Sequence, residues 1–372
     1  MKIGVPKEIK VHEYRVGMTP VAVHEAVAHG HQVLVEAGAA ERQGLSDDEY
    51  RKAGATILPS AAEVFAKADM IVKVKEPQLA ECRMLREGQT LFTYLHLAPD
   101  PEQAKALMAS GCTAIAYETV TNARGGLPLL APMSEVAGRM SIQAGAHCLE
   151  IAQGGRGALL GGVAGVAPAK VVILGGGVSG VNAAKMAVGL EADVTLLDIN
   201  VERLYQIKQQ FGATVTTLYS TRAAVEEQVL AADLVIGAVL IPGAAAPRLI
   251  TEKMVKAMKR GSVIVDISID QGGCAETSHA TTHAEPTYIM HDVVHYCVAN
   301  MPGAVARTST FALNNATLPF TLALADKGPA RAMKEDPHLL AGLNVHKGRI
   351  TYPAVAEALG IAGVDALKAL SA

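Results

Sequence analysis

The chain has 372 residues, of which 50% are hydrophobic, so it is long enough for two domains with sizeable cores and is not a disordered protein. Its 33 Lys and Arg against 36 Asp and Glu give a net charge of −3, which argues against nucleic acid or an anionic membrane as the main partner. Five Phe, nine Tyr and no Trp leave the core to aliphatic side chains, and 35 Gly suit helices packed closely on a parallel sheet.

The first third of the chain alternates between strand-like and helix-like segments. Apolar runs typical of buried strands recur at KIGVPKE (2–8), QVLVEAG (32–38), MIVKVKEP (70–77), TLFTYLHL (90–97) and TAIAYETV (113–120). Helical segments lie between them, for example AAEVFAKAD (61–69) and PEQAKALMASG (101–111). This alternation predicts a first α/β unit.

The middle of the chain repeats strand and helix at regular spacing. Apolar residues at helical spacing over 134–151 predict a long helix that joins two units. A short strand precedes Asn300, and longer strands are predicted at 169–177, 192–198, 213–219, 233–241 and 262–270. Helices are predicted between them, and Asn200 and Thr251 can cap two of these. Strand, helix, strand in this order is typical of a doubly wound sheet.

The residues after Arg307 are mostly helical and show no strand series of their own, so we expect them to pack back on the first unit. The predicted domains are a discontinuous first domain, 1–128 with 307–372, and a second domain, 129–306. The expected fold class is α/β, with two Rossmann-like domains, doubly wound parallel sheets, and long helices that link the domains and leave a cleft between them.

The sequence also indicates in which cellular compartment we expect the protein to lie. The N-terminal segment has scattered charges and lacks the apolar core of a signal peptide, and the five cysteines form no CxxC pair, as expected for reduced thiols in a cytoplasmic protein. The apolar stretch 157–184 is interrupted by Pro168 and Lys170 and is rich in glycine. We therefore predict no membrane segment.

A glycine-rich string, GGGVSG, contains Gly175, Gly177 and Gly180 in the spacing GxGxxG. The motif is weak alone, but here it lies between a strand and a helix, and Asp198 ends the next strand. Such glycines allow a tight bend, backbone approach to a diphosphate and close packing of helix on strand. Asp198 would accept hydrogen bonds from the adenosine ribose and favours NAD over NADP, although Arg203 nearby weakens that preference. The alternative is a tight strand–helix turn that binds no ligand.

Other kinds of site find little support. His291 and His295 are spaced like two metal ligands on one helical face, but no third ligand with a matching spacing stands out. We therefore expect a structural or subunit-interface pair and no metal, and we interpret His24, His29 and His31 in the same way. The sequence contains neither GxxxxGK[ST] nor GxSxG, which argues against a phosphate-loop NTPase and an α/β-hydrolase.

Three basic or titratable residues, Arg15, Lys75 and His96, follow predicted strands of the first unit. Open α/β sheets bind ligands at the carboxyl ends of their strands. A guanidinium suits a carboxylate, a lysine can also polarise a carbonyl oxygen, and a histidine can exchange a proton near neutral pH. Asp270 ends a predicted strand of the second unit and is a fourth candidate. Taken singly, each could equally be an ordinary surface charge or a hydrogen-bonded structural residue.

Long strings of the sequence resemble the bacterial alanine dehydrogenases, a family related to the NAD-binding component of proton-translocating transhydrogenase. They run from one end of the chain to the other: MKIGVPKEIKVHEYRVGMTP, IVKVKEP, TLFTYLHLAPD, APMSEVAGRMSIQAGAHCLE, GGGVSGVNAAKMAVGLEADVTLLD, DISIDQGGCAETSHATTH and ANMPGAVARTSTFALNNATLPF. Gly17 and Val21–Ala22 depart from the family's pattern, while all four candidate residues stand in place.

The resemblance implies reversible, NAD-dependent oxidative deamination of L-alanine to pyruvate and ammonium. Arg15 and Lys75 would bind the substrate. His96 would be the general acid/base, and Asp270 would help to activate water at the imino carbon. The implied cofactor-binding residues lie in the second domain: Ser134, Gly175, Gly177, Val178, Gly180, Asp198, Arg203, Ser220, Val239, Leu240, Ile267, Asp270, Val298, Asn300 and Met301. The family is typically hexameric, so a homo-oligomer is expected.

Two alternatives stay open. Another amino-acid dehydrogenase of the superfamily, acting on lysine and 2-oxoglutarate (saccharopine type), would need extra acid-binding groups. A catalytically silent NAD-binding component, like that of transhydrogenase, would bind NADH without turnover and would need a membrane partner. The absence of Trp suits a small substrate with a single methyl group better than a large ring.

Overall fold

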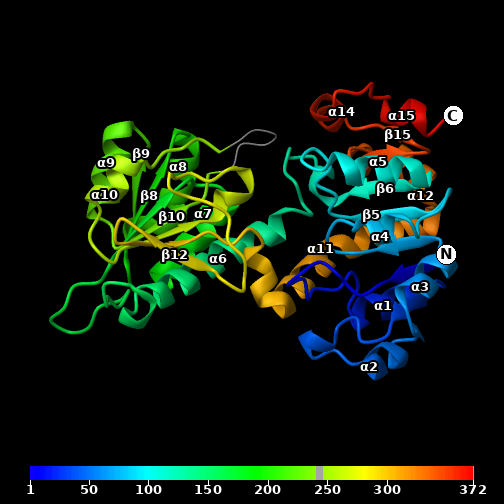
Figure 1. Ribbon diagram of the computed structural model, residues 1–372, viewed down its shortest axis with the longest axis horizontal. Coiled ribbons are helices and arrows are strands. Elements are labelled where there is room, and N and C mark those ends of the chain that lie inside the picture. The colour runs from blue at the N-terminus through cyan, green and yellow to red at the C-terminus, as the bar shows by residue number, and fades with distance from the viewer. Residues whose placement is uncertain (240–245, 372) are drawn as a thin grey trace. The chain divides into compact units, whose positions relative to one another are not determined.

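The protein forms two compact units along its chain, seen in a computed structural model that describes residues 1–239 and 246–371 (Figure 1). Unit 1 consists of Met1–Met133 together with Val305–Ala372, and unit 2 consists of Ser134–Ala304. The first unit is therefore discontinuous in sequence.

Unit 1 is built on an eight-stranded sheet. Its strands are β1 (Lys2–Val5), β2 (Gln32–Glu36), β3 (Thr56–Leu58), β4 (Met70–Val72), β5 (Thr90–Thr93), β6 (Thr113–Ala116), β14 (Leu343–His346) and β15 (Arg349–Ile350). The strand order is β15-β14-β6-β5-β4-β1-β2-β3, and the strands from β6 to β3 in this order are parallel to one another. The parallel part has the doubly wound order, which reverses direction at β1, where such sheets bind ligands.

Among the described residues of unit 1, the helices include α1 (Pro20–Ala28), α2 (Asp47–Lys52), α3 (Ala61–Lys67), α4 (Leu79–Cys82), α5 (Pro101–Ser110), α11 (Ala306–Lys327), α12 (Pro329–Glu335), α13 (Pro337–Leu340), α14 (Pro353–Leu359) and α15 (Ala366–Ala369). The ends of these helices are set by capping residues, as α5 illustrates. The Asp100 side chain accepts a hydrogen bond from the Gln103 N–H at 3.0 Å and so caps α5, which ends at Gly111 with φ +69°.

The core of unit 1 lies around its central strands, since every residue of β4, β5 and β6 is buried. Small residues allow the close packing that the composition indicated. A Cβ on Gly4 would lie only 2.7 Å from the Cβ of Ala68, so glycine lets the end of α3 approach β1 directly.

Two expectations for unit 1 require correction. The residues after Arg307 do contain strands, because β14 pairs antiparallel with β6 and β15 pairs antiparallel with β14. The hairpin is short, and its pairing partner β6 is distant in sequence, so no local pattern announces it. The parallel strands also end earlier than the apolar runs suggested, at Val5, Val72 and Thr93. The candidate residues therefore lie in loops beyond the strand ends.

Unit 2 is built on a seven-stranded sheet with the strands β7 (Lys170–Leu174), β8 (Asp193–Asp198), β9 (Val215–Tyr219), β10 (Leu234–Gly237), β11 (Val263–Asp266), β12 (Thr287–Met290) and β13 (Val293–Tyr296). The order is β12-β13-β11-β10-β7-β8-β9, and every pair except β12–β13 is parallel. This is again a doubly wound sheet, and its order reverses at β7.

The helices of unit 2 include α7 (Val178–Gly189), α8 (Val201–Phe211), α9 (Arg222–Ala231) and α10 (Glu252–Ala257), while α6 (Ala131–Cys148) carries the chain from unit 1 into unit 2. Asn200 and Thr251 cap α8 and α10, as predicted. The strand predicted over 262–270 is too long, because a 3-10 turn follows β11. In that turn the Asp266 carboxylate accepts a hydrogen bond from the Ser268 N–H at 3.1 Å.

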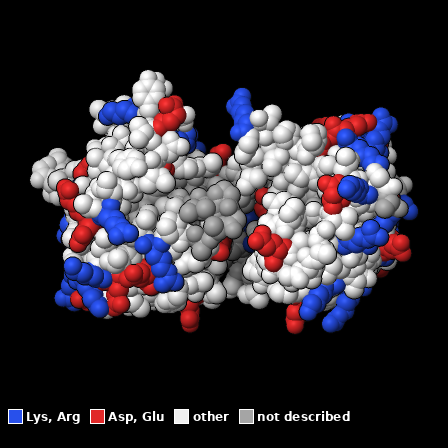
Figure 2. All heavy atoms as spheres, turned by 90° about the horizontal axis from the view of Figure 1, so that it is seen from above, with Lys and Arg blue, Asp and Glu red and all other residues white. Residues whose placement is uncertain are grey.

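The α/β class with two Rossmann-like sheets is confirmed, with the correction that each sheet has an antiparallel edge and is not wholly parallel. On the face drawn in Figure 2, Lys and Arg are interspersed with Asp and Glu, as a net charge of −3 leads one to expect. Among the helices of the described residues, none is long and apolar enough to span a membrane.

Candidate functional site

The turn after β7 requires glycine at two positions for reasons of packing. Gly175 has φ +103°, in the left-handed region, and a Cβ there would lie 2.6 Å from the carbonyl oxygen of Ala238. A Cβ on Gly180 would lie 1.8 Å from the carbonyl oxygen of Gly175. These two glycines therefore let α7 begin directly against the end of the sheet.

At position 177 the reason for glycine is open space and not close packing. Gly177 is the N-cap of α7, and beyond Gly177 and its two chain neighbours no heavy atom of the described residues lies within 4 Å of the position that a Cβ would take. Gly177 and Val178 are both exposed. The first N–H groups of a helix have no partner inside the helix, and their positive end attracts anions. The open side of Gly177 therefore fits the diphosphate of a dinucleotide.

Asp198 and Arg203 frame the same turn. The Asp198 carboxylate accepts hydrogen bonds from the N–H of Gly176 at 2.6 Å and from the N–H of Asn200 at 2.8 Å. The Arg203 Nε donates to the carbonyl oxygen of Gly176 at 2.6 Å. These bonds fix a half-buried carboxylate at the end of β8, where it can accept hydrogen bonds from ribose hydroxyls.

Three further predicted residues lie next to this turn or to the strand ends around it. The carbonyl oxygen of Ser134 accepts a hydrogen bond from the Oγ of Ser179, in the first turn of α7, at 3.0 Å. The Ser220 N–H donates to the carbonyl oxygen of Asp198 at 3.0 Å. The nitrogen of Val239 would lie 3.1 Å from a Cβ on Gly175. All three belong to unit 2 and surround the turn after β7.

The remaining predicted cofactor residues differ in exposure. Ile267 and Asn300 are half-buried, whereas Val298 and Met301 are 2% and 3% exposed and belong to the hydrophobic core of unit 2. Because their side chains are buried, Val298 and Met301 could contact a ligand only through the main chain. Leu240 lies outside the described residues.

Asp270 lies in the 3-10 turn Ile267–Gln271 and not at the end of a strand, which corrects the expectation from the sequence. The turn is anchored by Asp266, whose buried carboxylate also accepts hydrogen bonds from the Cys274 N–H at 2.8 Å and the Ser278 Oγ at 2.6 Å. Asp270 itself is exposed. A buried anion that is hydrogen-bonded by the surrounding main chain thus holds the turn that presents Asp270.

In unit 1, Arg15 is buried and held by a carboxylate. Its Nε and Nη2 donate to the two carboxylate oxygens of Glu13 at 2.7 and 2.6 Å, a bidentate pair. Its Nη1 lies 3.0 Å from the sulfur of Met133. Burial works to lower the pKa of Arg15, but the hydrogen bonds and charge of Glu13 outweigh it and raise that pKa. The guanidinium is therefore a fixed cation, and its Nη1 contacts the thioether of Met133, a weak acceptor.

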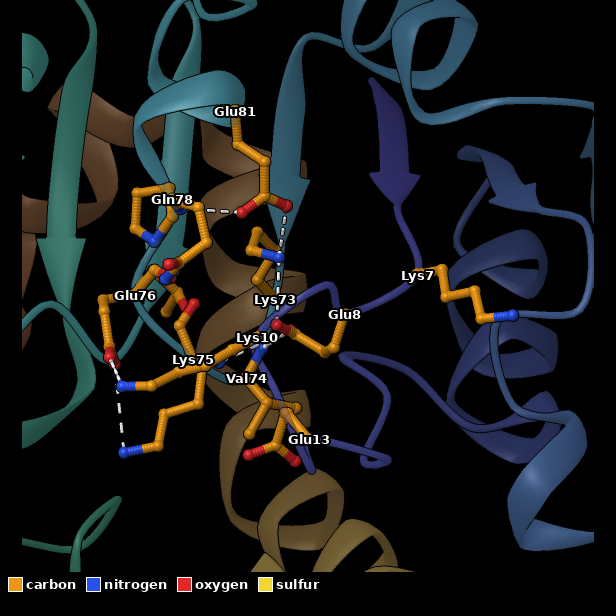
Figure 3. A network of polar contacts seen from close by, with 12 residues as sticks. Lys7, Glu8, Lys10, Glu13, Lys73, Val74, Lys75, Glu76, Gln78 and Glu81 are labelled. Atoms are coloured by element: carbon orange, nitrogen blue, oxygen red, sulfur yellow. Dashed lines mark hydrogen bonds and ion pairs between the residues drawn. The ribbon is translucent and has the colours of Figure 1, made fainter. Parts of the chain in front are cut away.

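Lys75 lies three residues beyond β4 and is half-buried. Its Nζ is 3.8 Å from one oxygen of Glu76, and Lys10 binds the other oxygen of the same carboxylate (Figure 3). Although burial opposes it, the charge of Lys75 and the hydrogen bond from Lys10 lower the pKa of Glu76. Two ammonium groups therefore flank one ionised carboxylate at this strand end.

His96 has φ +48°, a left-handed conformation that is uncommon for a residue other than glycine. The carboxylate of Glu118 supports it by accepting hydrogen bonds from the His96 N–H at 2.6 Å and the Leu95 N–H at 3.2 Å. The imidazole stacks on the ring of Tyr94 with an interplanar angle of 8°, and its Nδ1 is 3.9 Å from Glu118. The ring is thus oriented, while 42% of the side chain is open to solvent.

Short chains of contacts connect these three residues within unit 1. The Thr93 Oγ1, just before Tyr94, donates to the carbonyl oxygen of Lys75 at 2.9 Å. Burial raises the pKa of Tyr94, and the charge of Arg15 acts on the same phenol in the opposite direction. Lys75 and His96 follow the carboxyl ends of the neighbouring parallel strands β4 and β5, and Arg15 is close enough to Tyr94 for its charge to act on that side chain.

The sequence interpretation missed the carboxylates that hold these groups. Glu118 follows β6, so the rule that selected residues beyond parallel strands could have found it. Glu13 carries no comparable signal, because a charged residue two positions from an arginine is common in loops. Its role is visible only in its bidentate contact with Arg15.

His291 and His295 have different partners in the structure. His295 is fully buried, with its Nε2 2.8 Å from the Thr277 Oγ1, and burial lowers its pKa to about 4. His291 pairs with Glu252 at 2.9 Å, away from that network. Over residues 1–239 and 246–371, no three His, Cys, Asp or Glu side chains are placed to hold a metal ion together.

Comparison with known proteins identifies the family. Residues 4–137 match the family Alanine dehydrogenase/PNT, N-terminal domain, and residues 141–353 match Alanine dehydrogenase/PNT, C-terminal domain. The chain is 60% identical to a protein named alanine dehydrogenase from Halomonas elongata, over 98% of this chain and 99% of that one. It is 56% identical to alanine dehydrogenase from Bacillus subtilis, over 100% of this chain and 98% of that one.

Solved structures agree with these sequence matches. A structure named L-alanine dehydrogenase superposes with a TM-score of 0.94 at 54% identity, covering 97% of this chain and 99% of that one. A transhydrogenase from Sinorhizobium meliloti gives a TM-score of 0.82 at 26% identity, covering 95% of this chain and 100% of that one. The resemblance read from the sequence is confirmed: the chain belongs to the alanine dehydrogenase/PNT family.

Proposed function

We propose that the protein catalyses the reversible reaction of L-alanine, NAD⁺ and water to pyruvate, ammonium, NADH and a proton. The observation that carries this proposal is the identity of 60% with the Halomonas elongata alanine dehydrogenase over nearly the whole of both chains. At that identity and coverage, the residues proposed for binding and chemistry all stand within the matched region.

Unit 1 supplies the groups for the substrate. Arg15 can bind the substrate carboxylate, because an anionic oxygen is a far stronger acceptor for a guanidinium than the sulfur of Met133 that Arg15 contacts. Lys75 can bind the carboxylate or the carbonyl oxygen of pyruvate, because an ammonium favours negative charge that develops there. His96 can take and return the protons of the imine and carbinolamine steps, since its imidazole is oriented by Tyr94 and reaches solvent.

Unit 2 supplies the groups for NAD. The open side of Gly177 at the start of α7 would accept the diphosphate, and the fixed carboxylate of Asp198 would accept hydrogen bonds from the ribose. The nicotinamide, when bound, takes the hydride from the substrate Cα. Asp270 is proposed to help activate the water that attacks the imino carbon, and this role stays a prediction.

The first test is turnover. NADH oxidation should occur with pyruvate and ammonium together and should disappear when ammonium is left out. Pyruvate should be preferred over 2-oxoglutarate with lysine, which separates this reaction from the saccharopine-type alternative. The preference for NADH over NADPH is read in the same assay.

The proposed acid/base gives a second test. His96→Ala should lower kcat by about 10²–10⁴, the usual contribution of a positioned acid/base. It should leave NADH affinity, measured by fluorescence titration, within about twofold, because unit 2 supplies the groups proposed for NADH. Near-normal turnover by His96→Ala would remove His96 from this role.

A catalytically silent NAD-binding component is the second candidate, since the transhydrogenase of Sinorhizobium meliloti shares the fold at 26% identity. The difference between 26% and 60% identity favours the dehydrogenase. NADH binding without any turnover would reverse that choice. A hexameric assembly and a cytoplasmic location are part of the proposal through the family resemblance alone, and sedimentation and cell fractionation test them.

A further inference from the structure

A lysine in unit 1 is completely buried beside the residues proposed for substrate binding. The Nζ of Lys73 lies 2.6 Å from one oxygen of Glu81 and 3.0 Å from one oxygen of Glu8, and none of the Lys73 side chain is exposed (Figure 3). Both glutamates are almost fully buried as well, with 1% and 2% of their side chains exposed. Buried ion pairs of this kind contribute little to stability compared with apolar packing, so their presence favours a requirement for specific geometry.

The two glutamates hold different parts of the chain with their remaining oxygen. Glu81 accepts a hydrogen bond from the Gln78 N–H at 2.8 Å and so caps the short helix α4. Glu8 accepts hydrogen bonds from the Val74 N–H at 2.7 Å and the Lys75 N–H at 3.4 Å. Only the second set of contacts fixes the main chain that carries the Lys75 side chain.

The segment 73–75 lies beyond the end of β4, where the sheet no longer supplies a complete ladder. The carbonyl oxygen of Lys73 accepts a hydrogen bond from the Tyr117 OH at 2.9 Å, and that of Lys75 accepts one from the Thr93 Oγ1 at 2.9 Å. On the N–H side of the same segment, the Glu8 carboxylate accepts the hydrogen bonds from Val74 and Lys75. Main-chain hydrogen bonds also hold this segment, from the Lys73 N–H to the carbonyl oxygen of Phe92 and from the Tyr94 N–H to the carbonyl oxygen of Val74, both at 3.2 Å. Neither bond involves the Lys75 N–H, and Glu8 accepts hydrogen bonds from the Val74 and Lys75 N–H groups at once.

Charge makes Lys73 the counter-ion that this arrangement needs. Burial raises the pKa of Glu8, and the charge of Lys73 opposes that rise. Burial works to lower the pKa of Lys73, but the charges of Glu8 and Glu81 outweigh it and raise that pKa. The charge of Glu8 also acts on Arg15 and helps to keep it protonated. The Glu8 carboxylate thus acts on both residues proposed to bind the substrate: it accepts a hydrogen bond from the Lys75 N–H, and its charge stabilises the Arg15 cation.

We propose that Glu8 is a positioning residue of the substrate site, whose carboxylate fixes the main chain at Val74 and Lys75 so that the Lys75 side chain reaches the substrate. This inference rests on the proposed function. Lys73 neutralises Glu8 in the interior, and Glu81 shares Lys73 without touching the Lys75 main chain. Removal of Glu8 should therefore affect substrate binding, and removal of Glu81 should not.

The test compares Glu8→Ala with Glu81→Ala as its matched control, because each removes one buried carboxylate from Lys73. Wild-type turnover of pyruvate and ammonium with NADH comes first, since its absence refutes the proposed function and not the role of Glu8. Glu8→Ala should raise the KM for pyruvate by about tenfold to a hundredfold, the range expected when a binding group is displaced by about 1 Å. The KM for NADH should stay within about twofold in both variants.

Two conservative variants separate geometry from charge. Glu8→Gln keeps an oxygen for the two N–H groups but removes the charge and turns an amide NH2 toward Lys73, so the KM for pyruvate should rise less than in Glu8→Ala. Glu8→Asp keeps the charge but withdraws the carboxylate by one methylene, so the KM should rise, and this variant carries the test if Glu8→Ala does not fold. Equal pyruvate KM values in Glu8→Ala and Glu81→Ala overturn the proposal. So does an unchanged KM in Glu8→Asp, or a Glu8→Gln variant as impaired as Glu8→Ala.

Discussion

Adding one methyl group at Gly177 tests the dinucleotide site without disturbing the fold. A Cβ at this position meets no heavy atom of the described residues within 4 Å, and the backbone angles, φ −67° and ψ −166°, are open to alanine. Replacing glycine by alanine at a compatible position stabilises a protein by about 0.4–1 kcal/mol through the unfolded chain. Alanine is a weaker N-cap than glycine by a few tenths, so the stability of Gly177→Ala should stay within about 1 kcal/mol of the wild type.

NADH affinity should respond very differently. The diphosphate is proposed to receive hydrogen bonds from N–H groups at the start of α7, and a Cβ on Gly177 would occupy the space through which it approaches. Losing one hydrogen bond to a charged group costs about 1.5–3 kcal/mol. Because 1.4 kcal/mol corresponds to a factor of ten, the Kd for NADH should rise by about tenfold to a hundredfold.

Gly189→Ala is the matched control. Gly189 ends the same helix, and a Cβ there also meets no heavy atom of the described residues within 4 Å. It lies at the opposite end of α7 from the proposed diphosphate site, so the Kd for NADH should not change. The contrasting variant is Gly180→Ala, whose Cβ would lie 1.8 Å from the carbonyl oxygen of Gly175 and should destabilise unit 2 by about 1–3 kcal/mol.

The assay pairs fluorescence titration of NADH with thermal unfolding of the free protein. A fall in affinity at constant Tm for Gly177→Ala, with both quantities near wild type for Gly189→Ala, is the expected result. If Gly177→Ala binds NADH as tightly as the wild type, the diphosphate does not lie against Gly177 and the assignment of the glycine turn is wrong.

Two further predictions concern buried charge. Glu13→Ala should lower the free energy of unfolding by about 3–5 kcal/mol, because it leaves the buried guanidinium of Arg15 without its bidentate partner, and a urea titration that finds less than about 1 kcal/mol would contradict this. Burial lowers the pKa of His295 to about 4 from 6.5, so the unfolded chain takes up a proton in a pH range where the folded chain does not. The stability that His295 contributes is therefore complete above pH 6.5 and is lost, by up to about 3 kcal/mol, as the pH falls toward 4. Urea titrations at pH 7 and 4.5 should show a smaller loss for His295→Leu than for the wild type, and equal losses would refute the assignment.

The local sequence was sufficient for the turn that is proposed to bind NAD. A strand that ends in GGGVSG, a helix that follows it, and an acidic residue at the end of the next strand are all consecutive in the chain, so their spacing constrains their geometry. The structure adds the separate reason for each glycine: a left-handed φ at Gly175, open space at Gly177, and close packing at Gly180.

The substrate groups were recognisable only in part. Residues beyond the ends of parallel strands meet at one edge of a sheet, which is why Arg15, Lys75 and His96 could be selected. The carboxylates that hold them could not be paired with them from spacing alone, since Glu8 lies 65 positions from Lys73 and Glu118 lies 22 positions from His96. Such pairs form because the fold brings distant loops together.

The sequence by itself determined the α/β class, the parallel parts of the two sheets, the glycine turn and the family, because each of these depends on local periodicity or on long matching strings. Tertiary structure alone decided the antiparallel hairpin β14–β15, the 3-10 turn that carries Asp270, and the burial of Lys73 between two glutamates. The physical reason is that β14 is stabilised by pairing with β6 and Lys73 by its contact with Glu8, which are partners far away in the chain, while the turn that carries Asp270 depends on the burial of Asp266 and on its bonds to residues as far as Ser278. No pattern within a short window of residues records those partners.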